Sequence, residues 1–248
     1  MPFVVMAASH RIPSQPAPAT FRTDTTMVFV PVNVMDSSGR PILTLERQNF
    51  QVTENNRPQT ISYFAEEDSP VSVAIVADLS HSMMRKIALL REVVARFLSA
   101  ANEEDEFCLV ELRDQAELVY DFGASIGEIR SELSGAQARG HTALLDGMYL
   151  ALHQMSRAHY SRKALLVISD SGDNHSRFSA REVKGLAVES DTAVYAVQSP
   201  GQTNIWSPEE NKLLEDLAEQ SGGHAYSIEG QHEIPEAVQR IGMELRNQ

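Results

Sequence analysis

Val71-Ser72-Val73-Ala74-Ile75-Val76-Ala77-Asp78-Leu79-Ser80-His81-Ser82 decides the fold of this chain, because an apolar run ends directly in a carboxylate and two hydroxyls. The run is short and rich in β-branched residues, and a helical pattern follows it. It is therefore predicted to be a buried parallel strand. In open α/β sheets, ligands bind just beyond the carboxyl ends of such strands. Asp78, Ser80 and Ser82 offer oxygen ligands that suit a hard cation, but too little negative charge to hold it tightly, so further ligands are expected elsewhere.

Two later segments can supply those ligands. A second apolar strand is predicted at Ala164-Leu165-Leu166-Val167-Ile168, and it ends in Ser169-Asp170-Ser171-Gly172, a carboxylate followed by turn residues. Between the two strands, the glycine-bearing segment 140–147 runs into a predicted helix, whose apolar face holds Leu145, Met148, Leu152 and Met155. Thr142 lies where that helix is expected to begin, with its hydroxyl free to turn outward.

These residues resemble the von Willebrand factor type A domains. The metal-ion-dependent adhesion site of that family reads D-x-S-x-S, then a threonine in a G-x-T loop, then an aspartate after a later core strand, and all of these elements occur here in that order. The resemblance implies direct ligands at Ser80 and Ser82. It implies ligands that alternate between direct and water-bridged contact at Thr142 and Asp170, and a water-mediated ligand that also anchors the loop at Asp78.

The same resemblance implies a function. The cofactor would be Mg²⁺, with Mn²⁺ or Ca²⁺ as alternatives, and one coordination position would stay open for a carboxylate of a partner protein. We therefore expect a metal-dependent protein recognition module of the adhesion type, and not an enzyme.

Several neighbouring polar residues have simpler interpretations. Asp146 lies in the first turn of the predicted helix, where an acidic residue favours the helix dipole, so it is not assigned as a ligand. Asp173 and Asn174 could extend the cation site, but residues of these types more commonly build a turn.

Three histidines, His81, His141 and His175, fall within the three predicted loops. They could make partner binding sensitive to pH, or admit a softer metal such as zinc or nickel, or simply be solvated loop residues. The single tryptophan, Trp206, lies in a loop after another predicted strand, either as a contact for the partner or folded onto its own helix.

Composition limits the class of partner. The formal net charge is −13, and no basic patch is visible, so nucleic acid is not an expected ligand. A dication would reverse the sign of the potential at one place on an acidic protein.

The single cysteine, Cys108, lies in a predicted strand and is interpreted as a core thiol. No spanning helix is expected, and the compartment stays open, with an extracytoplasmic location favoured.

The chain is expected to have three parts: a disordered or linker segment over residues 1–24, a small β unit over 25–66, and the von Willebrand type A domain over 70–248. In the β unit, strict alternation predicts a half-buried strand through Val28, Val30, Val32 and Val34, followed by a hairpin with its tip at 54–58. This order resembles a bacterial subfamily of von Willebrand A-related proteins common in acidobacteria. An exposed edge of this unit could pair with a second copy of the chain.

From residue 70 onward, predicted strands alternate with predicted helices, which indicates an α/β fold with a doubly wound, mostly parallel sheet and helices on both faces. The exception is residues 117–122, predicted as an antiparallel strand.

The rival function is a Mg-dependent hydrolase that uses the same strand-end cluster. A haloacid dehalogenase type of phosphohydrolase needs a second aspartate where Ser80 stands, and neither a G-x-x-x-x-G-K loop nor a G-x-G-x-x-G turn occurs. A serine hydrolase would need a G-x-S-x-G elbow around Ser80 or Ser82, and there is none. A structural domain that has lost its ion is disfavoured by the complete set of motif residues.

Overall fold

The computed structural model describes residues 30, 32, 34, 42, 44–64, 70–170, 172–199 and 208–246. The main part of the described chain is a six-stranded sheet with the strand order β5-β4-β3-β6-β7-β8. Its strands are β3 (Ser72–Asp78), β4 (Glu106–Leu112), β5 (Ala116–Tyr120), β6 (Lys163–Ser169), β7 (Thr192–Gln198) and β8 (Ala225–Ser227). All neighbouring pairs are parallel except β4 and β5, which are antiparallel. The predicted fold class is confirmed.

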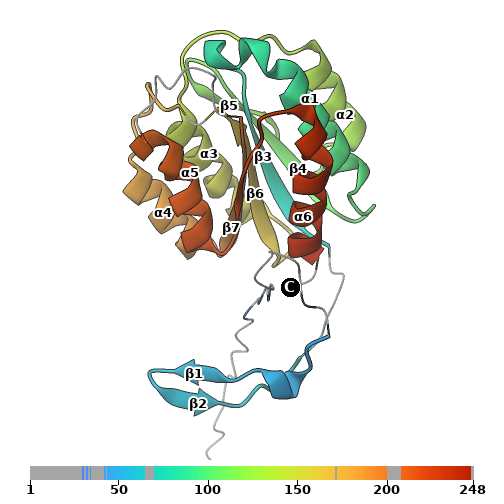
Figure 1. The fold of residues 1–248 in the computed structure, drawn as a ribbon, viewed down its shortest axis with the longest axis vertical. Helices are drawn as coiled ribbons and strands as arrows, with labels where there is room; N and C mark the ends of the chain where they lie inside the picture. Colours follow the sequence, from blue (N-terminus) through green and yellow to red (C-terminus); the bar gives the residue numbers. More distant parts are fainter. Residues whose placement is uncertain are drawn as a thin grey trace, which may run out of the picture. The chain divides into compact units, whose positions relative to one another are not determined.

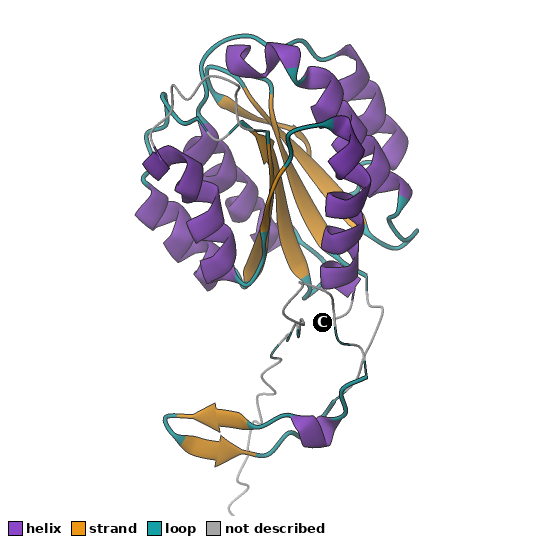
Figure 2. Ribbon diagram, in the orientation of Figure 1, coloured by secondary structure: helices purple, strands orange, loops and turns teal. Residues whose placement is uncertain are grey.

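Helices cover both faces of this sheet, as Figures 1 and 2 show. One layer contains α1 (Ile87–Ser99), α2 (Ile126–Gly135) and α6 (Ile234–Arg246), and the other contains α3 (Leu144–Gln154), α4 (Ala180–Glu189) and α5 (Pro208–Ser221). Short 3-10 turns lie at η2 (His81–Arg85), η3 (Met155–Arg157) and η4 (Gln231–Glu233). In Figure 1 the carboxyl ends of the parallel strands lie at the top of this domain.

Strand β3 is central, and every one of its residues is buried. Because side chains alternate across a strand, Val73, Ile75 and Ala77 pack in the core beneath α1, α2 and α6, whereas Ala74 and Val76 pack in the core beneath α3, α4 and α5. A strand with core on both sides has no polar face, which explains the continuous apolar run in the sequence.

Two helices begin with a capping box. Ser125 accepts a hydrogen bond from the Glu128 amide at the start of α2, and Ser179 accepts one from the Glu182 amide at the start of α4. In each case the glutamate also accepts a hydrogen bond from the serine amide, so two otherwise unpaired backbone donors are satisfied. The cap at Ser179 sets where the loop after β6 ends.

The predicted hairpin is present, but its turn is tighter than expected. Strands β1 (Val52–Glu54) and β2 (Arg57–Gln59) pair antiparallel, and η1 (Arg47–Asn49) precedes them. Asn55 and Asn56 form the whole loop with φ of 50° and 61°, values that a two-residue type I′ turn requires and that asparagine tolerates. Pro58, expected in the tip, therefore pairs with Thr53. A two-stranded sheet has only edge strands, where proline is accommodated.

The half-buried strand expected before the hairpin is not found at its described positions. Val30, Val32 and Val34 lie outside any strand, and Val30 and Val32 are 60% and 43% exposed. The Val34 carbonyl oxygen accepts a hydrogen bond from the Ile42 amide at 2.8 Å, but a single backbone hydrogen bond does not make a strand. The expected linker at 1–24, Val28 and Trp206 lie outside the described residues.

Close packing of α3 on β4 leads to a testable prediction at Gly147. A Cβ added there would lie 1.9 Å from Leu112 Cδ2, and Leu112 is buried. We expect Gly147→Ala to lower the free energy of unfolding by roughly 1–3 kcal/mol through overpacking. Gly185→Ala in α4 is the matched control, because nothing lies within 4 Å of its added Cβ; it should stabilise by about 0.5–1 kcal/mol through helix propensity. Urea denaturation measures both, and equal effects of the two variants would contradict the prediction.

Candidate metal centre

Asp78 is the last residue of β3 and is 0% exposed, yet both of its carboxylate oxygens have partners. The Ser80 amide donates a hydrogen bond to Oδ1 at 2.9 Å, and the Ser169 hydroxyl donates one to Oδ2 at 2.6 Å. Burial raises the pKa of Asp78 to about 6, although these hydrogen bonds act in the opposite direction. The carboxylate thus anchors the loop that follows β3. Burying its negative charge costs free energy, and a nearby cation would offset that cost.

Side-chain oxygens of Ser80, Ser82 and Asp170 form a chain of two hydrogen bonds in the loops that follow β3 and β6. Ser80 Oγ lies 3.0 Å from Ser82 Oγ, and Ser82 Oγ donates to Asp170 Oδ1 at 3.1 Å. Because the Ser82 hydrogen is used on Asp170, the Ser80 hydroxyl is the donor of the first pair. Asp170 follows β6 directly and is 3% exposed, Ser80 is buried, and Ser82 is exposed. The cluster therefore opens to solvent on the Ser82 side.

The spacing of these oxygens fits a small octahedral cation. At the Mg–O distance of about 2.1 Å, adjacent ligand oxygens of an octahedron are separated by roughly 3.0 Å. The two separations found here, 3.0 and 3.1 Å, match that edge. An ion bound here would replace the two hydrogen bonds and would have hard oxygen ligands of the kind that Mg²⁺ prefers.

The Thr142 segment is held beside this cluster by its backbone. The Thr142 amide donates to Asn174 Oδ1 at 3.1 Å, and the Thr142 carbonyl accepts from the amides of Asn174 and His175, both at 3.1 Å. Gly140, with a φ of 80°, accepts a hydrogen bond from the His81 amide at 3.0 Å, which ties the segment to the D-x-S-x-S loop. Thr142 is buried, and within the described part of the chain no hydrogen bond joins its hydroxyl to the other four predicted ligands.

The neighbouring acidic residues have structural partners, as the turn interpretation predicts. Asp173 Oδ1 accepts from the Leu144 amide at 3.0 Å and from the Ser176 hydroxyl at 2.6 Å. Asp146 does more than favour a helix dipole, because its Oδ1 accepts from the amides of Arg177 and Phe178. Burial raises the pKa of Asp146, but these hydrogen bonds outweigh it and hold the pKa below its ordinary value. Both carboxylates thus fix the loop after β6 to α3.

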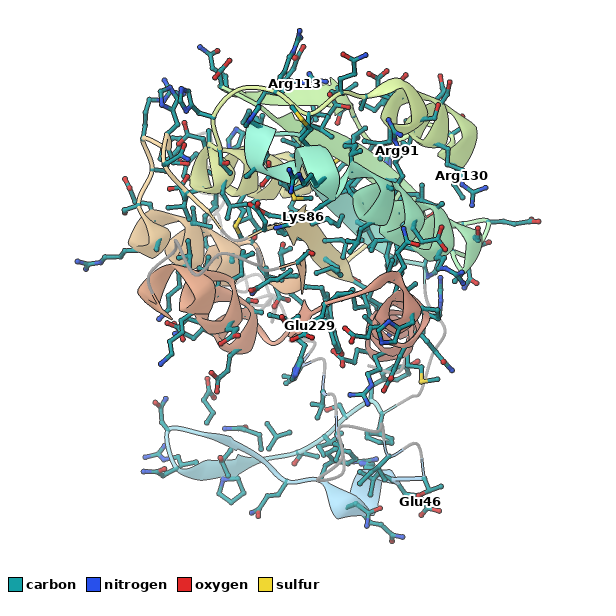
Figure 3. All side chains as sticks on the ribbon, turned by 45° about the horizontal axis from the view of Figure 1, so that its top comes forward. Glu46, Lys86, Arg91, Arg113, Arg130 and Glu229 are labelled. Atoms are coloured by element: carbon teal, nitrogen blue, oxygen red, sulfur yellow. The ribbon has the colours of Figure 1, made fainter. Side chains whose placement is uncertain are left out.

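Two contacts of the site were not found from the sequence. Ser169 was assigned only to a strand end, but its hydroxyl holds Asp78. Lys86, the residue before α1, places its Nζ 3.2 Å from Asp170 Oδ2 and 2.5 Å from the Ser199 carbonyl oxygen. Its only sequence signal is its position four residues after Ser82. Figure 3 shows Lys86 near the middle of the view, whereas Arg130 lies near its right edge.

The three histidines take different positions around the cluster. The rings of His141 and His175 stack with their centroids 5.1 Å apart, and His81 lies on the D-x-S-x-S loop itself; all three are exposed. Among the described residues, no group of three or more His, Cys, Asp or Glu side chains is arranged to hold a metal. The oxygen cluster draws instead on hydroxyls and two carboxylates.

The chain is similar in sequence to known proteins. Residues 73–173 match the sequence model of the von Willebrand factor type A domain. Over 107 residues the chain is 32% identical to inter-alpha-trypsin inhibitor heavy chain H4 of Bos taurus, an alignment that covers 40% of this chain and 12% of that protein.

Solved structures also share the fold, among them these two. One is a von Willebrand factor type A protein from Catenulispora acidiphila, with a TM-score of 0.60 and 17% identity over 72% of this chain and 43% of that one. The other is proximal thread matrix protein 1 from the mussel byssus with a zinc-occupied MIDAS motif, with a TM-score of 0.58 and 14% identity over 71% of this chain and 45% of that one. This chain thus aligns with less than half of either protein.

Proposed function

From the premise that this chain carries a von Willebrand factor type A domain, we propose that it binds a divalent cation at the carboxyl edge of its sheet and recognises a partner protein through that cation. The proposed ligands are the five residues of the predicted site: Asp78, Ser80, Ser82, Thr142 and Asp170. The proposed cation is Mg²⁺, with Mn²⁺ or Ca²⁺ as alternatives.

One observation carries the proposal: Ser80, Ser82 and Asp170 present oxygens at the spacing of an octahedral edge. The buried carboxylate of Asp78 lies at the base of the same loop, where a cation would offset the cost of its burial. Zinc in the MIDAS motif of the byssus protein supports a divalent ion at this place in the fold.

The partner we propose presents a carboxylate. A chain with a formal net charge of −13 repels acidic proteins, and a dication at an opening on the Ser82 side would attract one locally. We extend the proposal to a location outside the cytoplasm, because a further structural neighbour is a pilus adhesin of Lactobacillus rhamnosus GG. None of the described helices is long and apolar enough to span a membrane.

The rival reaction, hydrolysis by the same cluster, has less support. A serine nucleophile needs a base within hydrogen-bonding distance. The Ser82 hydroxyl donates to the carboxylate of Asp170, and a carboxylate is intrinsically a weaker base than imidazole. Within the described residues, no imidazole hydrogen bonds to either motif serine. We expect screens on phosphate and ester substrates to show no turnover that depends on Ser80 or Ser82.

Calorimetric titration of the metal-stripped protein with Mg²⁺ and Mn²⁺ tests the proposed function. Wild type should bind one ion, and Ser82→Ala should bind at least about tenfold more weakly, because it loses a ligand oxygen. Ser134→Ala is the matched control, since Ser134 is exposed on α2 and its hydroxyl donates to the Ser131 carbonyl of the same helix. Equal binding by Ser82→Ala and wild type would contradict the assigned ligand, and absence of binding to wild type would contradict the proposed function.

A further inference from the structure

We propose that Lys86 is the counter-cation of this site. Its ammonium neutralises Asp170 in the metal-free protein, and its positive charge lowers the affinity of the site for the metal. This inference rests on the proposed function, because it concerns how the same site regulates its ion. It assigns to Lys86 a role that the D-x-S-x-S motif does not contain.

The position of the ammonium is fixed from both sides. Lys86 Nζ donates to Asp170 Oδ2 at 3.2 Å and to the Ser199 carbonyl oxygen at 2.5 Å, so it joins the loop after β6 to the end of β7. The side chain of Lys86 is 18% exposed and that of Asp170 is 3% exposed, which limits screening by water and salt. Lys86 itself is the N-cap of α1, so its backbone is set by the helix that follows the motif.

Asp170 divides its two oxygens between two kinds of partner. Oδ1 accepts from Ser82, within the oxygen cluster, and Oδ2 accepts from Lys86. A cation that takes Oδ1 would therefore lie close to the ammonium and across a single carboxylate from it. Like charges at such a distance in a partly buried site repel strongly, so the ammonium must lower the affinity of the metal.

Lys86 also sets the sign of the charge that the metal-loaded site presents to a partner. Counted formally, the carboxylates of Asp78 and Asp170 and the ammonium of Lys86 together give the site a charge of −1. A dication changes that charge to +1. Without Lys86 the metal-loaded site would be neutral. Lys86 therefore lowers the affinity for the metal but leaves the loaded site positively charged for an acidic partner.

The test compares Lys86→Met with Lys86→Arg, which keeps the charge, and with Lys184→Met as a matched control. Lys184 is exposed on α4, and its loss changes the net charge of the chain by the same amount. Each protein is stripped of metal, titrated with MgCl2 and MnCl2 by calorimetry, and denatured with urea in EDTA.

We expect Lys86→Met to bind Mg²⁺ about tenfold more tightly than wild type or more. Its urea midpoint in EDTA should be lower than that of wild type, because Asp170 then lacks its counter-charge. Lys86→Arg and Lys184→Met should stay within about twofold of wild type in affinity, because the former keeps the charge and the latter changes it far from the site. Unchanged or weaker Mg²⁺ binding by Lys86→Met would overturn the proposal.

The outcome also separates this inference from the proposed function. If wild type binds no metal but Lys86→Met does, the Lys86 ammonium blocks the ion. That result would support the role of Lys86 and would contradict the proposal that the wild-type protein binds a metal. If neither protein binds Mg²⁺ or Mn²⁺, both proposals fail. If wild type binds and Lys86→Met binds identically, the metal site stands and the role of Lys86 fails alone.

Discussion

Asp78→Asn should make the metal-free protein more stable at pH 7.5 and at the same time abolish its metal binding. The asparagine can keep the local contacts, since its carbonyl oxygen can accept from the Ser80 amide and its amide group can donate to the Ser169 hydroxyl. It removes the buried negative charge, which is the unfavourable part of the present arrangement. It also removes the carboxylate on which the proposed cation depends.

Proton linkage gives the direction of the expected change in stability. The pKa of Asp78 is about 6 in the folded chain against 3.8 as its ordinary value, so the folded state holds the proton more tightly. The stabilising contribution of the protonated group is complete below pH 3.8 and is lost as the pH rises towards 6. Above that window, ionised Asp78 destabilises the metal-free protein by roughly 3 kcal/mol, and Asp78→Asn should recover up to that amount.

Urea denaturation in EDTA at pH 4.5 and 7.5 measures this effect. The gain of Asp78→Asn over wild type should be large at pH 7.5 and small at pH 4.5. Asp216→Asn serves as the matched control, because Asp216 is exposed on α5. Added Mg²⁺ should stabilise wild type at pH 7.5 but not Asp78→Asn, since only a protein that binds the ion gains stability from it. A variant less stable than wild type at pH 7.5 would contradict the account of Asp78.

The fold could be predicted because its main signals are local. The apolar runs of β3 and β6 identify central parallel strands, and the positions of Asp78 and Asp170 directly after them place both residues at the same edge of the sheet. The alternation around Val30 was a weaker signal, because a strand depends on a pairing partner that the pattern itself does not specify.

The details of the site could not be predicted, because they depend on register. Ala77 pairs with Ile168, so the next residues along, Asp78 and Ser169, lie side by side at the strand ends and form their hydrogen bond. A run that is apolar on both faces does not reveal this register, since a shift by one residue leaves the pattern unchanged. The contact of Lys86 with Asp170 spans 84 positions and likewise depends on packing that only the structure contains.

Val76→Asp should prevent folding, although it introduces the same side chain that the chain already carries two residues later. Val76 and Asp78 lie on the same face of β3, and both are 0% exposed. The difference is in their surroundings. Asp78 accepts hydrogen bonds from Ser80 and Ser169, whereas Val76 pairs with Val110 and Val167 and packs in an apolar core.

A carboxylate at position 76 would have no such donors, and its burial would cost several kcal/mol whether it ionised or took up a proton. That is comparable to the whole stability of a typical domain, about 5–15 kcal/mol. Val76→Thr is the control of similar shape, expected to cost roughly 1–3 kcal/mol and to remain folded. Circular dichroism and thermal denaturation at pH 7.5 separate the two cases. A cooperative transition for Val76→Asp within a few degrees of wild type would mean that this part of the sheet can hold a carboxylate without donors, and the explanation given for Asp78 would then also be wrong.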